Sequence, residues 1–248
     1  MKLLIPICLL AITATAQNGF QFVQTAAVNA PVAAGGGGGI ELESVSAVLV
    51  ESSALADPED FTHTIATLSD GYIVVHISYY LGSASPTDVT FDSVSMTKIG
   101  TATCSFESSL RGDLWGLAVG NKTAGTYTVS IIGAGGDKAV AASTSWNNVH
   151  QTTSVGTPAT AEGDNTTAPS VAVGSATGEI VVDVLARYSG GTATIGGGQT
   201  SLFNDSTADG TIDGAASYEA GAGSVTMSWT LASPARWVVV GIPLKPAT

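Results

Sequence analysis

Residues 223–246 predict two strands, and the first of them, residues 224–231, alternates between apolar and polar side chains, which is the pattern of a β-strand with one buried and one solvated face. The apolar positions of this strand are Val225, Met227, Trp229 and Leu231. After a break at Pro234, residues 236–240 bring apolar side chains to both faces. A strand buried on both faces lies deep in a sheet, so we expect much of the core to form on it. Pro243 lacks an amide donor, so pairing on one side is expected to stop near it.

The rest of the chain has the composition of an all-β protein. Of its 248 residues only 11% are charged and 30 are glycine, which suits short strands and tight turns better than helices. Strand-like runs recur at residues 45–49, 72–81, 89–91, 94–96, 114–119, 127–132, 140–146, 171–173, 179–188, 202–203 and 215–218. These runs predict two antiparallel sheets packed face to face as a sandwich of jelly-roll type. Residues 57–60 instead predict a single capped helical turn, with Pro58 at its first position.

A polar, threonine-rich connection at residues 150–170 divides the strand-like runs into two halves. We expect one domain over residues 40–248, because the second half alone offers few strands to close a core. The alternative is two small sandwiches, one on each side of the connection.

Residues 1–16 predict a secretory signal peptide. Lys2 precedes an apolar run at residues 3–12, and Ala14-Thr15-Ala16 provides a small-residue cleavage site. The apolar run is too short to anchor the chain in a bilayer, and no later run is long enough to be a membrane helix. A lipoprotein signal using Cys8 is the alternative, but Cys8 lies inside the apolar run. We therefore expect a secreted protein, extracellular or at the cell surface, in which Cys104 is a small buried hydrophobe, with an intermolecular disulfide as the alternative.

Residues 17–39 form an N-terminal arm and a tether of consecutive glycines at residues 35–39. In the arm, Phe20, Phe22 and Val23 carry a fragment of strand pattern. One interpretation is a loosely packed end of the chain. The other is strand exchange, in which the arm adds a strand to the open sheet edge of a neighbouring subunit.

The formal net charge is −12, from 20 acidic and 8 basic residues. Such a surface repels phosphate backbones and anionic lipids, so the sequence predicts no nucleic-acid partner. The acidity is consistent with a soluble extracellular protein.

Several strand phrases resemble a recurring module of secreted and surface proteins of bacteria. They are SDGYIVVHISYY, GDLWGLAVGNKTAGTYTVSI, ATGEIVVDVLA and AGAGSVTMSWTLASPARWVVVGIPLKP, and the similarity covers residues 61–246. The resemblance implies a jelly-roll-like sandwich used as a surface, adhesive or polymer-associated module. It supplies no functional residues, because its motifs are strand-and-turn phrases without a catalytic signature.

The sequence predicts no catalytic centre. It has no G-x-S-x-G elbow, and His63, His76 and His150 do not occur in a zinc-binding motif. Asp183 and Glu219 are the carboxylates that could converge as a glycosidase pair. An ion pair between Asp183 and Arg187 on one strand face is the plainer interpretation.

Two further sets of residues are candidates for binding calcium or sugars. Asp205, Asp209 and Asp213 cluster in one polar loop, and carboxylates on a loop suit Ca²⁺, although the spacing does not match a known calcium motif. Calcium is therefore the one possible cofactor. Exposed tryptophans could stack on sugars, but Trp115, Trp146, Trp229 and Trp237 all occur in strand patterns, so core packing is expected.

Together these patterns predict a non-catalytic secreted β-sandwich that acts at the cell surface in adhesion, matrix association or glycan association. The expected partners are surface polysaccharide or other copies of the chain. The alternative is a structural subunit of an extracellular filament or coat, joined by strand exchange through the arm. A third alternative is a glycan-active enzyme that uses Asp183 and Glu219.

Overall fold

The computed structural model describes residues 39–51, 55–80, 85–135, 137–189, 191 and 193–248. The described residues contain eighteen β-strands and no helix, and thus no helix that could cross a membrane. The all-β class predicted from the alternating side chains is confirmed.

The first ten strands form one sandwich. They are β1 (Glu41–Val45), β2 (Leu49–Glu51), β3 (Glu59–Ile65), β4 (Gly71–Tyr80), β5 (Asp88–Phe91), β6 (Val94–Ser95), β7 (Thr97–Cys104), β8 (Glu107–Gly120), β9 (Gly125–Ile132) and β10 (Lys138–Asn147). The larger sheet has the order β1-β10-β4-β8-β7, with β2 also paired to β10, and the smaller sheet has the order β3-β9-β5-β6. Their apolar faces meet in a core that includes Ile73, Val75, Phe91 and Val129.

The last eight strands form a second sandwich. They are β11 (Ala159–Thr166), β12 (Ser170–Gly174), β13 (Ile180–Tyr188), β14 (Ala193–Ile195), β15 (Thr200–Ser206), β16 (Ile212–Ala220), β17 (Ser224–Leu231) and β18 (Ala235–Leu244). The larger sheet has the order β11-β18-β13-β16-β15, and the smaller has β12-β17-β14. The predicted antiparallel two-sheet sandwich is confirmed and occurs twice, whereas the jelly-roll topology stays a prediction.

The two sandwiches share one strand order. Strands β1, β10, β4, β8 and β7 of the first large sheet correspond to β11, β18, β13, β16 and β15 of the second, and β3-β9-β5 corresponds to β12-β17-β14. The register agrees at the centre, where Ser78 pairs with Gly112 and Ala186 pairs with Gly214. On this alignment Tyr72–Tyr80 matches Ile180–Tyr188, so Tyr80 and Tyr188 occupy equivalent positions.

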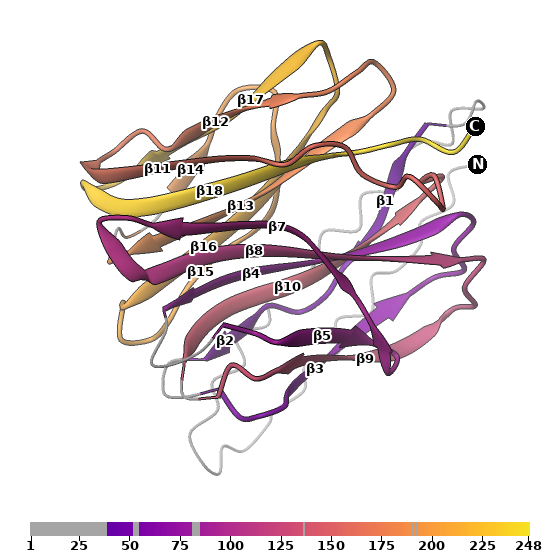
Figure 1. Ribbon diagram of the computed structural model, residues 1–248, viewed down its shortest axis with the longest axis horizontal. Coiled ribbons are helices and arrows are strands. Elements are labelled where there is room, and N and C mark those ends of the chain that lie inside the picture. Colours follow the sequence, from indigo (N-terminus) through magenta and orange to yellow (C-terminus); the bar gives the residue numbers. More distant parts are fainter. Residues whose placement is uncertain (1–38, 52–54, 81–84, 136, 190, 192) are drawn as a thin grey trace, which may run out of the picture.

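The two large sheets pack against each other, which gives four layers in all (Figure 1). We call this contact between the large sheets the seam. Strand β18 lies between β11 and β13, where Val239 faces the core of its own sandwich and Val240 faces the seam. The prediction of a strand buried on both faces is thus confirmed for residues 237–240, whereas the Arg236 side chain is partly exposed. The single domain over residues 40–248 stays a prediction, and the buried seam supports it.

A glycine lets the large sheets approach closely at one point of the seam. A Cβ at Gly214 would lie 2.7 Å from the Cβ of Val140 and 2.9 Å from the Cβ of Ser78. At the equivalent Gly112, the nearest atom to such a Cβ, on Val184, is 3.5 Å away. The seam is therefore tighter at Gly214 than at Gly112.

Two local predictions have clear outcomes. Pairing of β18 with β11 ends at Gly241, whereas pairing with β13 continues to Leu244, so Pro243 stops the ladder on one side as expected. The helical turn predicted at residues 57–60 is wrong, because Glu59 begins β3 and pairs with Ile131 of β9. Pairing with a neighbouring strand outweighs the local helical preference there.

Candidate functional site

The three aspartates of the predicted calcium site lie on β15, on β16 and in the turn between them. Asp213 Oδ2 lies 3.4 Å from the guanidinium of Arg187, and Asp209 accepts a hydrogen bond from Lys138. Lys138 holds the pKa of Asp209 well below its usual range. In the part of the chain that the structure describes, no three His, Cys, Asp or Glu side chains form a group suited to a metal. The calcium site at Asp205, Asp209 and Asp213 stays a prediction, and protein cations already neutralise two of its acids.

The residues predicted for strand exchange, Phe20, Phe22 and Val23, lie outside the described residues. Strand exchange therefore stays a prediction. Deletion of residues 17–39 tests it, because an assembly held by the arm would then fall apart in light scattering.

Asp183 is enclosed in the core of the second sandwich. Its Oδ1 accepts hydrogen bonds from the amide and hydroxyl of Ser217, at 2.7 and 2.8 Å. Its Oδ2 accepts a hydrogen bond from Trp229 Nε1 at 2.7 Å. Burial raises the pKa of Asp183 to about 7, although these donors act in the opposite direction.

The two carboxylates of the predicted acid pair differ in burial. Glu219 is paired with Val181 of β13 and is partly exposed, whereas the Asp183 side chain is fully buried. A glycosidase needs both carboxylates beside the sugar, so Asp183 offers no open substrate face. The predicted ion pair between Asp183 and Arg187 is wrong, because Arg187 pairs with Asp213 instead.

Two histidines are buried as neutral hydrogen-bonding groups. His63 Nε2 lies 3.0 Å from the hydroxyl of Ser44. His76 Nδ1 donates to the carbonyl oxygen of Asp183 at 3.0 Å, so its Nε2 is an acceptor, 3.2 Å from the Thr144 hydroxyl. Burial lowers the pKa of each ring to about 4. Their contacts tie strands together, since His63 links β3 to β1 and His76 links the two large sheets.

All four tryptophans belong to the core, as predicted, with at most 6% of any of them exposed. Cys104 is also buried, in the seam beside Leu110 and Ile212. The large exposed aromatic side chains are instead Phe106 and Tyr188, which no sequence motif marks.

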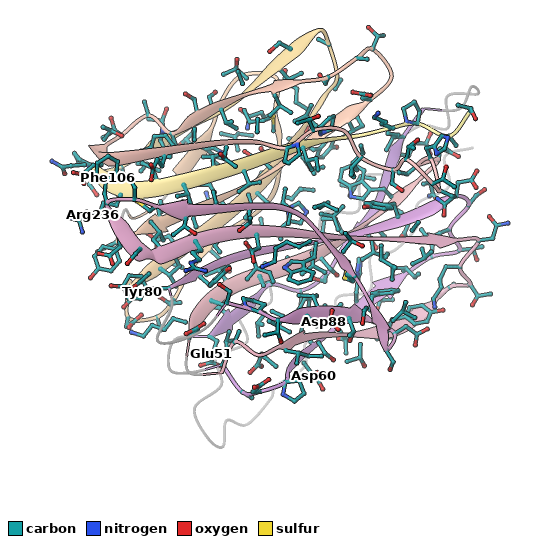
Figure 2. All side chains as sticks on the ribbon, viewed as in Figure 1. Glu51, Asp60, Tyr80, Asp88, Phe106 and Arg236 are labelled. Carbon is teal, nitrogen blue, oxygen red and sulfur yellow. The ribbon has the colours of Figure 1, made fainter. Side chains whose placement is uncertain are left out.

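Aromatic side chains gather at one end of the seam. Tyr80 ends β4 and Tyr188 ends β13, and their ring centroids are 5.1 Å apart with an interplanar angle of 32°. Tyr188 is 37% exposed, and Phe106, in the turn between β7 and β8, is 51% exposed. Figure 2 shows Tyr80 and Phe106 at the same end of the molecule as Arg236. We call Tyr80, Phe106, Glu107, Tyr188 and Arg236 the aromatic end.

Polar groups hold the aromatic end in place. The Tyr80 hydroxyl donates to Glu107 at 3.4 Å, and Glu107 lies 3.0 Å from Arg236. Arg236 also lies 3.1 Å from Asp164 of β11. Partial burial and the nearby Glu107 charge raise the pKa of Tyr80, so its hydroxyl keeps its proton as a donor. Residues from both sandwiches thus form one surface of aromatic rings and paired charges.

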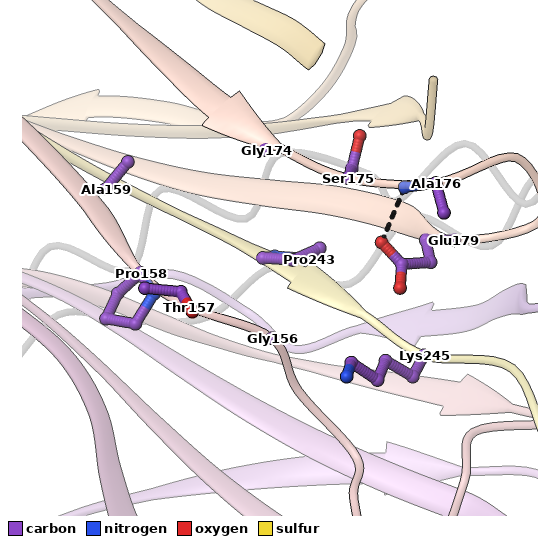
Figure 3. A pocket seen from close by; sticks show the side chains of 10 residues that line it. All are labelled: Gly156, Thr157, Pro158, Ala159, Gly174, Ser175, Ala176, Glu179, Pro243 and Lys245. Carbon is purple, nitrogen blue, oxygen red and sulfur yellow. Dashed lines mark hydrogen bonds between the residues drawn. The ribbon is translucent and has the colours of Figure 1, made fainter. Parts of the chain in front are cut away.

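Two hollows lie towards the other ends of these strands, and Lys245 borders both. The first hollow, of about 510 Å³, is shown in Figure 3, where the Glu179 carboxylate is turned to the amide of Ala176. The second hollow, of about 400 Å³, has a lining rich in hydroxyl groups, from Tyr72, Thr97, Thr152, Thr153 and Ser154. We call the second one the Tyr72 hollow.

Sequence patterns point only in part to these surfaces. Tyr80 and Tyr188 end two strand phrases that match each other, but nothing in the sequence shows that their rings meet. Comparison with protein-family models, with curated proteins and with solved structures finds no match for this chain. The function must therefore be argued from the geometry.

Proposed function

We propose that this protein is a non-catalytic, secreted surface module that associates with neutral polysaccharide through the aromatic end. The observation that carries the proposal is the adjacent, mutually tilted and partly exposed pair of Tyr80 and Tyr188, with the exposed Phe106 at the same end of the molecule. The resemblance to surface and polymer-associated modules agrees with this function.

Tyrosine and phenylalanine rings provide flat apolar faces, and a tyrosine adds a polar hydroxyl at its edge. Sugar rings have apolar C–H faces that pack on such aromatic surfaces, while their hydroxyls need hydrogen-bonding partners. Glu107 and Arg236 provide charged acceptors and donors beside the rings. The two are already paired with each other, so they are held in position before a ligand arrives, which lowers the entropic cost of binding.

The net charge of −12 favours a neutral polymer at this surface. An acidic protein repels polyanions over a distance of about 8 Å at physiological ionic strength. A neutral glycan has no such penalty, and stacking on aromatic rings does not depend on its charge.

Binding to soluble neutral polysaccharides, measured by affinity electrophoresis, tests the proposal. The double variant Tyr188→Ala, Phe106→Ala is expected to bind about tenfold more weakly, because each aromatic contact contributes about 0.5–1.5 kcal/mol. Val94→Ala is the matched control. Val94 is 53% exposed, and it lies on β6 in the smaller sheet of the first sandwich, outside the aromatic end.

Val94→Ala is expected to leave the affinity unchanged, and the polymer is expected to keep its length during binding. Equal affinities of the double variant and the unchanged protein would remove the aromatic end as the binding surface. Shortening of the polymer would instead support the glycan-active alternative.

A further inference from the structure

The Tyr72 hollow is lined by the hydroxyl end of a buried tyrosine. Tyr72 is 4% exposed, and its side chain packs in the seam beside Val74 and Trp146. Its hydroxyl lies against Gly116, where a Cβ would come within 2.1 Å of the oxygen, and Gly116 also lines the hollow. Among the described residues, no group forms a hydrogen bond with this hydroxyl. Burial raises its pKa to about 12, so it stays a neutral donor.

Lys245 lines the same hollow, and it also borders the first hollow, which Glu179 lines. Lys98, Lys122 and Lys138 each pair with an aspartate, but Lys245 has no such carboxylate partner among the residues that the structure describes. No acidic residue lines the Tyr72 hollow. An ammonium group without a partner in a protein of net charge −12 is the natural binding point for a single carboxylate.

The wall of the hollow is ordered by hydrogen bonds. His150 Nδ1 accepts from the amides of Thr152 and Thr153, at 3.2 and 3.1 Å. The amide of Lys245 donates to the carbonyl oxygen of Ser154 at 2.8 Å, which fixes the lysine backbone to the same loop. The hydroxyl-bearing side chains are thus presented by a loop that is held at both ends.

We propose that the Tyr72 hollow binds one sugar unit that carries a carboxylate. Lys245 Nζ pairs with the carboxylate, the Tyr72 hydroxyl donates to a sugar oxygen, and the threonine and serine hydroxyls contact the remaining ring hydroxyls. A volume of about 400 Å³ lies within the usual range for small-molecule sites. The net charge of −12 disfavours a polyanionic chain more than a single acidic unit.

This site does not depend on the proposed function of the aromatic end. Tyr72 and Tyr80 lie near opposite ends of β4, about 26 Å apart along the strand. Variants at one surface therefore leave the other intact, and the failure of either proposal is visible separately.

Titration of the full chain with D-glucuronate, followed by NMR chemical shifts and by calorimetry, tests the proposal. D-Glucose and acetate are titrated in parallel, as the sugar without the acid and the acid without the sugar. Glucuronate is expected to bind with a dissociation constant on the order of 1 mM, and more tightly than either comparison compound. Lys245→Gln is expected to weaken glucuronate binding about tenfold, and Tyr72→Phe about fivefold, because each removes one hydrogen-bond donor.

The control variant is Lys122→Gln, which removes a lysine paired with Asp92 in the first sandwich. It is expected to leave glucuronate binding unchanged. Equal affinity for glucose would overturn the role of the carboxylate, and equal affinity for acetate would overturn the role of the sugar. Unchanged binding in both Lys245→Gln and Tyr72→Phe, or no binding of glucuronate at all, would overturn the site itself.

Discussion

The two sandwiches have the same strand order but neutralise a buried carboxylate in different ways. In the first, Asp113 lies 3.0 Å from Lys98 and accepts a hydrogen bond from Tyr79 at 2.8 Å. In the second, Asp183 accepts its hydrogen bonds from the neutral donors Ser217 and Trp229. The shared topology fixes where side chains point, but it does not fix the chemistry that they bring.

The positions of the two acids support this conclusion. Counting from the equivalent pairs at the seam, Asp183 takes the place of Val75 in the first sandwich, and Asp113 corresponds to Ala215 in the second. Each carboxylate thus occupies a position that is apolar in the other sandwich. Burying a charged group costs several kcal/mol unless it is paired or protonated, so each site depends on its local donors.

The largest expected effect is a pH dependence of stability, to which buried groups of the two sandwiches contribute in opposite directions. His63 and His76, on the first sandwich, have pKa values lowered from 6.5 to about 4, and Asp183, in the second, has its pKa raised from 3.8 to about 7. Between pH 4 and 6.5 the unfolded chain carries two histidine protons that the folded chain lacks. The folded chain carries one proton, on Asp183, that the unfolded chain lacks. Stability therefore rises with pH across this window, by about 1.4 kcal/mol per pH unit and about 3 kcal/mol in total.

Chemical denaturation at a series of pH values measures this slope. Asp183→Asn removes the opposing proton and is expected to make the slope about twice as steep. As the pH rises above 6.5, the unchanged protein loses stability slightly until Asp183 has ionised near pH 7. The Asp183→Asn variant does not show this loss. A flat stability profile between pH 4 and 6.5 would show that the histidines are not buried as neutral groups.

The next effect compares the loss of one donor from each buried acid. Trp229→Phe removes the donor to Asp183 Oδ2 and is expected to lower the free energy of unfolding by about 2 kcal/mol. Tyr79→Phe removes a donor from Asp113, but Lys98 remains beside the same oxygen, so the expected loss is about 1 kcal/mol.

Both variants are compared by denaturant unfolding at a pH above the pKa of Asp183, where its carboxylate is charged. Equal losses, or a larger loss in Tyr79→Phe, would mean that Lys98 contributes nothing to holding the Asp113 charge.

The sequence predicted the strands well and the meeting points of side chains poorly. Residues 223–246 correctly predicted β17 and β18, because side-chain alternation and the missing N–H donor of Pro243 are properties of a single strand. The pairing of Arg187 with Asp213 was missed, because spacing along one strand cannot show which acid a neighbouring strand brings. The ring contact between Tyr80 and Tyr188 was missed for the same reason, since it forms only where the two large sheets meet.

The smallest expected effect tests the symmetry of the seam at its two equivalent glycines. Gly214→Ala places a methyl group 2.7 Å from the Cβ of Val140, so the large sheets must move apart, and the expected loss of stability is about 1–2 kcal/mol. Gly112→Ala meets its nearest atom at 3.5 Å, an ordinary contact, and alanine loses less backbone entropy on folding than glycine does. Its effect on stability is expected to be neutral or favourable, within about 0.5 kcal/mol. The thermal midpoints of the two variants measure the difference. If Gly112→Ala destabilises the protein as much as Gly214→Ala, the sheets approach equally at both glycines, and the seam is more symmetric than these distances indicate.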